Sequence, residues 1–93
     1  MMKIICVCGM GLGSSLILKM SVESAMKQLG VPCDVEHVSS GTMGGMREDF
    51  IVAAEDFRDE LAGKDNVVYV QNVIKVPEIK DAIELYLKEK GIL

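Results

Sequence analysis

Aromatic and basic residues are scarce in this chain of 93 residues. It has no tryptophan, two tyrosines, two phenylalanines and one histidine, and 14 Asp and Glu residues outnumber its 10 Lys and Arg residues. Nucleic-acid binding needs a basic surface that neutralises phosphates and, for single strands, aromatic side chains on which bases stack. The net charge of −4 and the scattered basic residues therefore argue against a nucleic-acid partner.

Long apolar runs and paired cysteines are also lacking. No stretch approaches the ~18 consecutive apolar residues of a membrane-spanning helix, and the amino-terminal stretch has no small-residue cleavage site of a secretory signal. The three cysteines are odd in number and lack the spacing of a disulfide scaffold, which indicates a reducing compartment. We therefore expect a soluble, cytoplasmic protein.

The length fits a single domain over residues 1–93, and 49% of the residues are apolar. A domain of this size buries a sufficient core without metals or disulfides. Because aromatic residues are few, we expect a mostly aliphatic core in which the seven methionines fill gaps.

Apolar residues alternate along the chain between strand and helix patterns. The patterns predict strands at 3–8, 33–39, 50–54 and 67–70, helices at 14–29 and from Pro77 onward, and a short helix or turn at 55–63. Gly30 is expected to close the first helix. This alternation predicts an α/β fold with a parallel sheet joined by right-handed crossovers.

The stretch VCGMGLGSS, residues 7–15, places three glycines and two serines between a predicted strand and a predicted helix. Glycines let backbone N–H groups turn toward one centre, and the start of a helix adds unpaired N–H donors with a partial positive charge. Such a loop binds anions and suits phosphate best. Ligands of parallel sheets bind beyond the carboxyl ends of the strands, which is where this loop should lie.

Cys8 stands at the entrance of that loop. Cysteines at helix N-termini have thiol pKa values lowered to about 3.5–7.5, so the same field favours the nucleophilic thiolate. A nucleophile beside a cradle for a tetrahedral dianion predicts phosphoryl transfer to sulfur. Cys6 lies inside a strand and Cys33 has no glycine loop, so both are interpreted as core residues. Cys6 and Cys8, taken with the single His37, do not make a tetrahedral metal site.

Nucleotide-binding patterns fit the stretch less well. Gly9, Gly11 and Gly13 place the third glycine one position too early for a dinucleotide-binding fingerprint. A nucleotide-binding loop of the Walker type needs a lysine next to a serine or threonine after its glycines, and the pair Ser14-Ser15 offers none. Neither nucleotide class is therefore expected.

Cysteine-dependent phosphatases resemble this loop more closely, but they carry an arginine six residues after the cysteine, where this chain has Ser14. Without a guanidinium held on the transferring phosphoryl group, hydrolysis should be slow. The pattern therefore favours a carrier that holds a phosphoryl group and passes it on. A low-molecular-weight cysteine-dependent phosphatase-like hydrolase is the alternative.

The stretch KIICVCGMGLGSSLILKM, residues 3–20, resembles the start of the enzyme IIB subunits of the bacterial sugar phosphotransferase system. The resemblance is to the lactose/cellobiose-type superfamily and its ascorbate- and galactitol-like branch. It is carried by the motif Cys-Gly-x-Gly-x-Gly-Ser-Ser directly after a first strand, whereas the stretch DFIVAAEDF at 49–57 agrees more loosely. The implied topology is flavodoxin-like, as in low-molecular-weight phosphatases: a four-stranded parallel open sheet in the order 2-1-3-4 with helices on both faces.

In this family a phosphohistidine on enzyme IIA donates its phosphoryl group to the IIB cysteine, which passes it to a sugar held by the membrane permease IIC. The resemblance implies that Cys8 is the phosphorylated residue and that the carrier needs no metal or other cofactor. It also implies an ascorbate- or galactitol-like sugar and a cytoplasmic location, with association to the membrane through IIC. The implied phosphate-binding residues are Gly9, Met10, Gly11, Leu12, Gly13, Ser14 and Ser15.

Two pairs of residues near the loop have more than one interpretation. Met10 and Leu12 are more apolar than the residues of an ascorbate-type loop, so they either dock against IIA or IIC or fold inward as core. Glu55 and Asp56 should follow the third strand near the active edge. An ordinary solvated surface is the favoured interpretation of this pair, and orienting partners or limiting stray hydrolysis is the other. The sugar, the oligomeric state and the conformation of residues 40–47 stay open.

Overall fold

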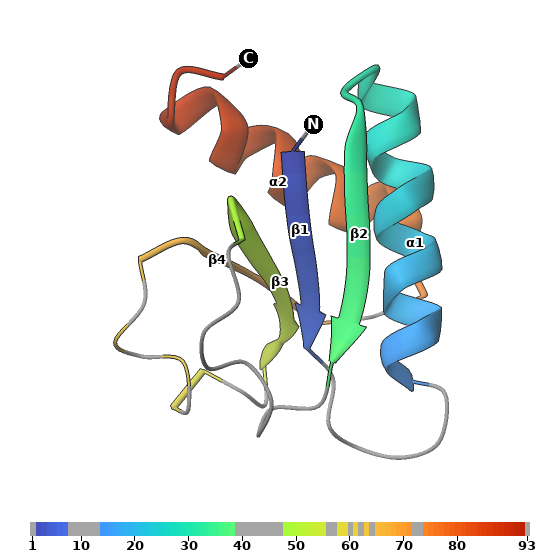
Figure 1. Ribbon diagram of the computed structural model, residues 1–93, viewed down its shortest axis with the longest axis vertical. Coiled ribbons are helices and arrows are strands. Elements are labelled where there is room, and N and C mark those ends of the chain that lie inside the picture. Colours follow the sequence, from blue (N-terminus) through green and yellow to red (C-terminus); the bar gives the residue numbers. More distant parts are fainter. Residues whose placement is uncertain are drawn as a thin grey trace.

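The computed structural model describes residues 2–7, 14–38, 48–55, 58–59, 61, 63, 65–71 and 74–92, with the backbone alone for residues 14, 15 and 38. Within these residues the chain forms four strands and two helices (Figure 1). In chain order they are β1 (Met2–Val7), α1 (Ser14–Leu29), β2 (Cys33–Val38), β3 (Phe50–Ala54), β4 (Val67–Val70) and α2 (Val76–Glu89). Each predicted strand and long helix is present, and every boundary that was predicted agrees to within one residue.

The strands form one parallel sheet in the predicted order, β2-β1-β3-β4. At the carboxyl end of β1, Val7 pairs with Val38 of β2 on one side and with Ala53 of β3 on the other. The chain therefore leaves β1 for one neighbour and later returns to its opposite side, which makes β1 the point where strand order reverses. Figure 1 shows the carboxyl ends of the strands at the lower edge of the sheet, level with the first turn of α1.

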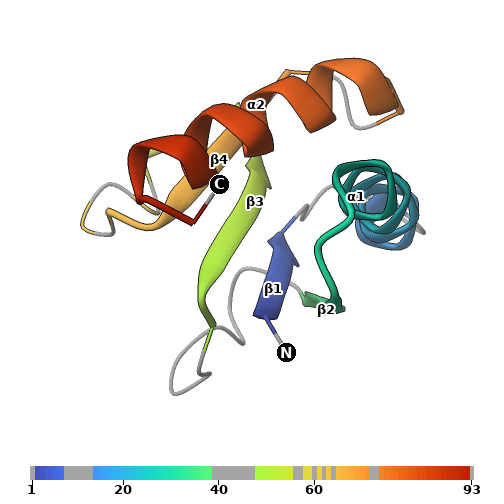
Figure 2. The ribbon, with the colours of Figure 1, turned by 90° about the horizontal axis from the view of Figure 1, so that it is seen from above.

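Both described helices pack on the same face of the sheet (Figure 2). Their buried side chains join those of the strands in one core, which excludes water from this face and supplies the main stabilising term of the fold. The core is aliphatic as predicted, and Phe50 is its only fully buried aromatic residue in the described part of the chain. Its members are Ile4, Cys6, Leu18, Val22, Ala25, Met26, Val35, Phe50, Val52, Val68, Val70, Ile79, Ile83 and Leu87.

The opposite face of the sheet is buried as well. Ile5, Val7, Ile51 and Ala53 have no exposed surface, and Leu61 packs against them. No α-helix of the described residues covers this second face, so the helices expected on both faces are observed on one of them within that part of the chain. These strands are buried on both sides, which explains why they read as continuous apolar runs.

Helix α1 ends at a glycine, as the sequence predicts. Gly30 has a φ of 74°, its amide donates to the carbonyl oxygen of Lys27 over 3.1 Å, and the amide of Val31 donates to that of Met26 over 3.2 Å. This pair of hydrogen bonds satisfies the last carbonyl groups of the helix, and it needs a left-handed residue that glycine adopts without strain. Gly91 has the same role after α2, with a φ of 77°.

Among the described residues of the segment 55–63, Glu55 lies in a 3-10 helical turn and residues 58, 59, 61 and 63 lie in turns, so both the helix and the turn predicted for this segment have described residues. The amide of Arg58 donates to the carbonyl oxygen of Glu55 over 3.0 Å and so turns the chain back after β3. Residues 40–47, whose conformation the sequence leaves open, fall outside the described residues. None of the helices that the structure describes has the length and apolar content needed to cross a membrane.

Candidate functional site

The predicted phosphate loop connects two described elements at the carboxyl edge of the sheet. β1 ends at Val7 and α1 begins at Ser14, so Cys8 and residues 9–13 fall outside the described residues, as do the side chains of Ser14 and Ser15. The two elements that anchor the loop are described, and they set where it starts and ends. It starts from the central strand and ends at the amino end of α1, the arrangement that the sequence predicts (Figure 1).

The first turn of α1 contains no acidic side chain. The first N–H groups of a helix lack partners within the helix and carry a partial positive charge, which a carboxylate in the same turn would offset. Leu16 and Ile17 stand in this turn instead, each with 45% of its surface exposed. The positive potential of the helix end is therefore left for an anion from outside the helix.

The two other cysteines are unsuited to nucleophilic chemistry. Cys6 has no exposed surface, and burial raises the pKa of its thiol to about 12. Cys33 pairs with Met2 at the amino edge of the sheet and packs against the core, and burial also raises the pKa of its thiol. Both thiols are protonated at neutral pH and so are poor nucleophiles. Their interpretation as core residues is confirmed, in full for Cys6 and as a half-buried residue for Cys33.

Three side chains form a link across the carboxyl ends of β3 and β4. Glu55 follows the last residue of β3, as predicted, while Asp56 falls outside the described residues. The Nη2 group of Arg58 donates to Oε1 of Glu55 over 2.9 Å. The guanidinium carbon of Arg58 also lies 4.3 Å from the ring centre of Tyr69 on β4. The sequence pattern does not predict this link, because only the turn after β3 brings residue 58 back over the neighbouring strand.

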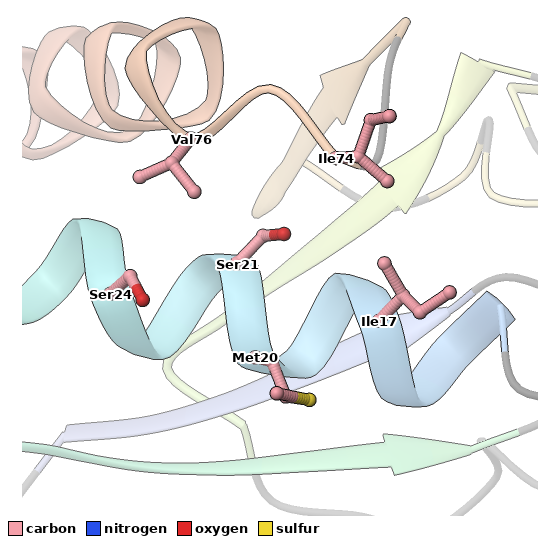
Figure 3. Close-up of a pocket in the computed structure, with 6 residues that line it drawn as sticks. All are labelled: Ile17, Met20, Ser21, Ser24, Ile74 and Val76. Atoms are coloured by element: carbon pink, nitrogen blue, oxygen red, sulfur yellow. The ribbon is translucent and has the colours of Figure 1, made fainter.

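An open, largely apolar groove of about 300 Å³ lies between α1 and the start of α2 (Figure 3). In Figure 3, Ile17 and Ser21 of α1 point toward the segment that carries Ile74 and Val76. Met20 and Ile74 are unusually exposed for apolar residues, at 59% and 65%. In the sequence, this groove could have been found from the apolar residues of α1 that lie outside the buried stripe of the helix. The lining residues are Ile17, Met20, Ser21, Ser24, Ile74 and Val76.

The family comparison identifies the class of protein, a component of a phosphotransferase system. The family model described as "PTS system, Lactose/Cellobiose specific IIB subunit" matches residues 3–85. The chain belongs to this family of IIB subunits of the phosphotransferase system, which confirms the predicted family. This membership does not favour the alternative of a phosphatase-like hydrolase.

Two relatives are similar over nearly the whole chain. The ascorbate-specific PTS system EIIB component of Mycoplasma pneumoniae (strain ATCC 29342 / M129 / Subtype 1) is 36% identical over 90 residues, which cover 92% of this chain and 95% of the relative. The solved lactose-specific IIB component domain from Streptococcus pneumoniae superposes with a TM-score of 0.62 at 17% identity, over 94% of this chain and 95% of that one. At that identity the second likeness concerns the fold, and it agrees with the observed sheet order.

Proposed function

We propose that the chain is a single cytoplasmic IIB domain that carries a phosphoryl group on Cys8, from a phosphohistidine of IIA to a sugar bound by the permease IIC. The match of residues 3–85 to the IIB family is the observation that carries this proposal. The positions of the cysteines support it. Cys8 directly follows the central strand at the edge where such sheets bind ligands, whereas Cys6 is sealed in the core and Cys33 lies at the amino edge.

Two displacements at phosphorus make up the proposed reaction. In the first, the thiolate of Cys8 attacks phosphorus, the S–P bond forms, and the P–N bond to histidine breaks with its electron pair left on the imidazole nitrogen. In the second, a sugar hydroxyl attacks and releases its proton, the O–P bond forms, and the S–P bond breaks to return the thiolate. Catalysis of such steps is mostly positioning and charge stabilisation.

The charge on the transferring group needs donors that are already in place. We assign this role to the backbone N–H groups of residues 9–15, to the hydroxyl groups of Ser14 and Ser15, and to the amino end of α1. The absence of acidic residues in the first turn of α1 supports the assignment, because no carboxylate there competes with the phosphoryl group. Met10 and Leu12 belong to the same loop, and their contact with a partner is part of this proposal.

An ascorbate-like sugar is the proposed substrate class, with a galactitol-like sugar as the second choice. The relative from Mycoplasma pneumoniae at 36% identity is named as ascorbate-specific, which supports this choice. The sugar itself would be held by IIC, so the chain would meet the membrane through that partner.

The test is transfer of radiolabelled phosphoryl from a phosphorylated ascorbate-type IIA protein to the purified chain. We expect one phosphoryl group per chain and its complete loss in Cys8→Ser, while the matched variant Cys33→Ser is labelled at the normal rate. Hydrolysis of an aryl phosphate by the wild-type chain should stay at background. Labelling that survives Cys8→Ser, or rapid aryl phosphate turnover that depends on Cys8, would contradict the proposal.

A further inference from the structure

We propose that the open groove between α1 and the start of α2 is the docking surface for the IIA protein, which inserts aliphatic side chains of an amphipathic helix into it. The inference rests on the proposed function, in which IIA is the phosphoryl donor, and adds to it the surface that holds the donor. All six residues that line the groove are described (Figure 3).

Exposed apolar side chains gather at this groove. The described residues include six large apolar side chains with high exposure, and four of them, Leu16, Ile17, Met20 and Ile74, lie in or beside it. Leu16 and Met20 are four residues apart on α1, so they are neighbours on the helix surface. Single exposed apolar residues are ordinary, whereas a group of them around a hollow marks a binding surface.

Both walls of the groove are held in place by the fold. On α1, Val22 has no exposed surface and packs in the core. On the other wall, Val76 packs against the same core, and Oε1 of Glu78 accepts a hydrogen bond from the amide of Gln71 over 3.3 Å. This bond ties the residue after β4 to the first turn of α2 and brackets the segment that carries Ile74. A preformed groove loses little conformational entropy when a partner binds.

The groove lies toward the edge of the sheet at which the strands end. Ile17 belongs to the first turn of α1, and Ile74 comes four residues after the end of β4. The amino end of α1 and the carboxyl ends of the strands lie at the same edge in Figure 1. Parallel sheets bind their ligands at this edge. A donor held in the groove would therefore lie on the side of the molecule at which transfer is proposed.

The size and shape of the groove favour a transient protein partner. A stable interface buries about 800 Å² on each partner. Four apolar side chains that are between 45% and 65% exposed offer only a few hundred Å², so a permanent dimer of this chain is not favoured. A lipid surface is not favoured either, because the apolar residues line a hollow, whereas membrane binding needs a protruding apolar face.

The charges beside the groove favour IIA over the permease. Lys75 is exposed and stands between two lining residues, and Lys19 precedes the lining residue Met20. Glu23 is the one acidic residue directly next to a lining residue in the sequence, and the amino end of α1 adds a partial positive charge. Cytoplasmic loops of membrane proteins carry an excess of lysine and arginine, which matches this rim poorly. The surface on IIA is assigned aliphatic side chains flanked by carboxylates.

Five single substitutions test the inference. Met20→Ser and Ile74→Ser each remove an apolar side chain from one wall, and Leu85→Ser is their control, because Leu85 is 60% exposed on α2 and does not line the groove. Lys75→Gln tests the rim, since the side chain of Lys75 makes no capping hydrogen bond to α2. Its control is Lys88→Gln, because Lys88 is 61% exposed in the last turn of α2. Binding to unphosphorylated ascorbate-type IIA is measured by isothermal titration calorimetry, and transfer from phosphorylated IIA by initial rates.

Met20→Ser and Ile74→Ser should each weaken IIA binding about three- to tenfold and raise the KM for phosphorylated IIA by a similar factor, with kcat nearly unchanged. Lys75→Gln should weaken binding about two- to threefold at low salt and have no effect at high salt. Leu85→Ser and Lys88→Gln should bind IIA as the wild-type chain does. Each variant should unfold at nearly the wild-type temperature, because the changed residues are exposed.

Equal IIA binding by Met20→Ser, Ile74→Ser and the wild-type chain, or no binding by the wild-type chain, would overturn the inference. A wild-type dimer in sedimentation equilibrium that Met20→Ser dissociates would overturn it too, as would binding to protein-free lipid vesicles that Met20→Ser abolishes. Normal acceptance from IIA combined with slower transfer to sugar in vesicles containing IIC would instead assign the groove to the permease. If the chain binds IIA as predicted but accepts no phosphoryl group, the proposed function fails and the docking surface stands.

Discussion

The ring of Phe50 on β3 lies 5.1 Å from the ring of Tyr86 on α2, with their planes tilted by 39°. Phe50 has no exposed surface and is the largest fully buried side chain of the described residues. Aromatic pairs at this separation contribute ~0.5–1.5 kcal/mol beyond their burial. The contact therefore packs α2 against β3, the strand that pairs with β1 on the side opposite β2.

Replacing Phe50 by alanine should lower the free energy of unfolding by about 3–5 kcal/mol, since it removes a buried ring and leaves a cavity. Urea unfolding followed by circular dichroism measures the change. Leu85→Ala is the matched control on α2, because Leu85 is 60% exposed and its loss should change stability by less than about 0.5 kcal/mol. Equal effects of the two substitutions would contradict this view of the core.

Gly30→Ala should destabilise the chain by roughly 1–2 kcal/mol, because an alanine strained at a φ of 74° replaces a glycine that closes α1. A Cβ atom at residue 30 would meet nothing within 4 Å, so the cost comes from the backbone alone. Gly63 also has open space around it but no positive φ. Gly63→Ala should then be neutral or stabilising by about 0.4–1 kcal/mol. Thermal unfolding measures both changes. If Gly63→Ala lowered the unfolding temperature as Gly30→Ala does, the positive φ of Gly30 would not be the cause of the difference predicted here.

The buried thiol of Cys6 makes stability depend on pH in the alkaline range. Its pKa is about 12 in the folded chain against an ordinary value of 9.0, so the unfolded chain loses this proton first as the pH rises. The thiol's contribution is complete below about pH 9 and is lost between about pH 9 and pH 12, with a slope of at most ~1.4 kcal/mol per pH unit.

Cys6→Ala removes that contribution, so the stability difference between wild type and variant should shrink as the pH rises from about 8 to about 10.5. Urea unfolding at several pH values measures it. Tyr86, whose pKa is also raised by burial, is present in both proteins and cancels in the comparison. Parallel stability curves for the two proteins would show that the thiol of Cys6 is not shielded from solvent.

A carboxylate placed in the first turn of α1 should raise the stability of the chain and lower its rate of phosphoryl acceptance. Leu16→Glu should stabilise the chain by about 0.3–1 kcal/mol relative to Leu16→Gln, since a negative charge is favourable at this end of a helix. The same charge should slow phosphoryl acceptance by Cys8 severalfold, because it competes with the incoming anion. Leu16 is 45% exposed, so neither variant disturbs the core. Equal transfer rates in the two variants would argue that α1 does not help to hold the phosphoryl group.

Local patterns carried most of the fold prediction. The run FIVAA at Phe50–Ala54 is a strand with both faces covered, and the stripe through Ile79, Ile83 and Leu87 is the buried face of α2. Residues 55–63 could not be decided from sequence. Among the described residues there, the amide of Arg58 donates to the carbonyl oxygen of Glu55 and Leu61 packs against the sheet, and neither contact leaves a periodic signal in the sequence.

For the candidate site, the sequence predicted the glycine loop and the cysteine at its entrance, which lie outside the described residues, and the carboxylate after β3, which is observed. It missed Arg58 and Tyr69, and also the groove between Ile17 and Ile74. These residues are distant in sequence, and each looks like ordinary surface when only its neighbours in the chain are considered.

The sequence by itself determined the family, the alternation of strands and helices, the glycine that ends α1 and the apolar residues of the core. These features depend on periodicity and on backbone preferences that act over a few residues, so they can be read locally. Only the tertiary structure decided that both described helices share one face, that Val7 at the end of β1 pairs with Ala53 of β3, and that Arg58 lies over the ring of Tyr69. Those relationships depend on strand register and on side chains that meet after folding, and no local preference specifies them.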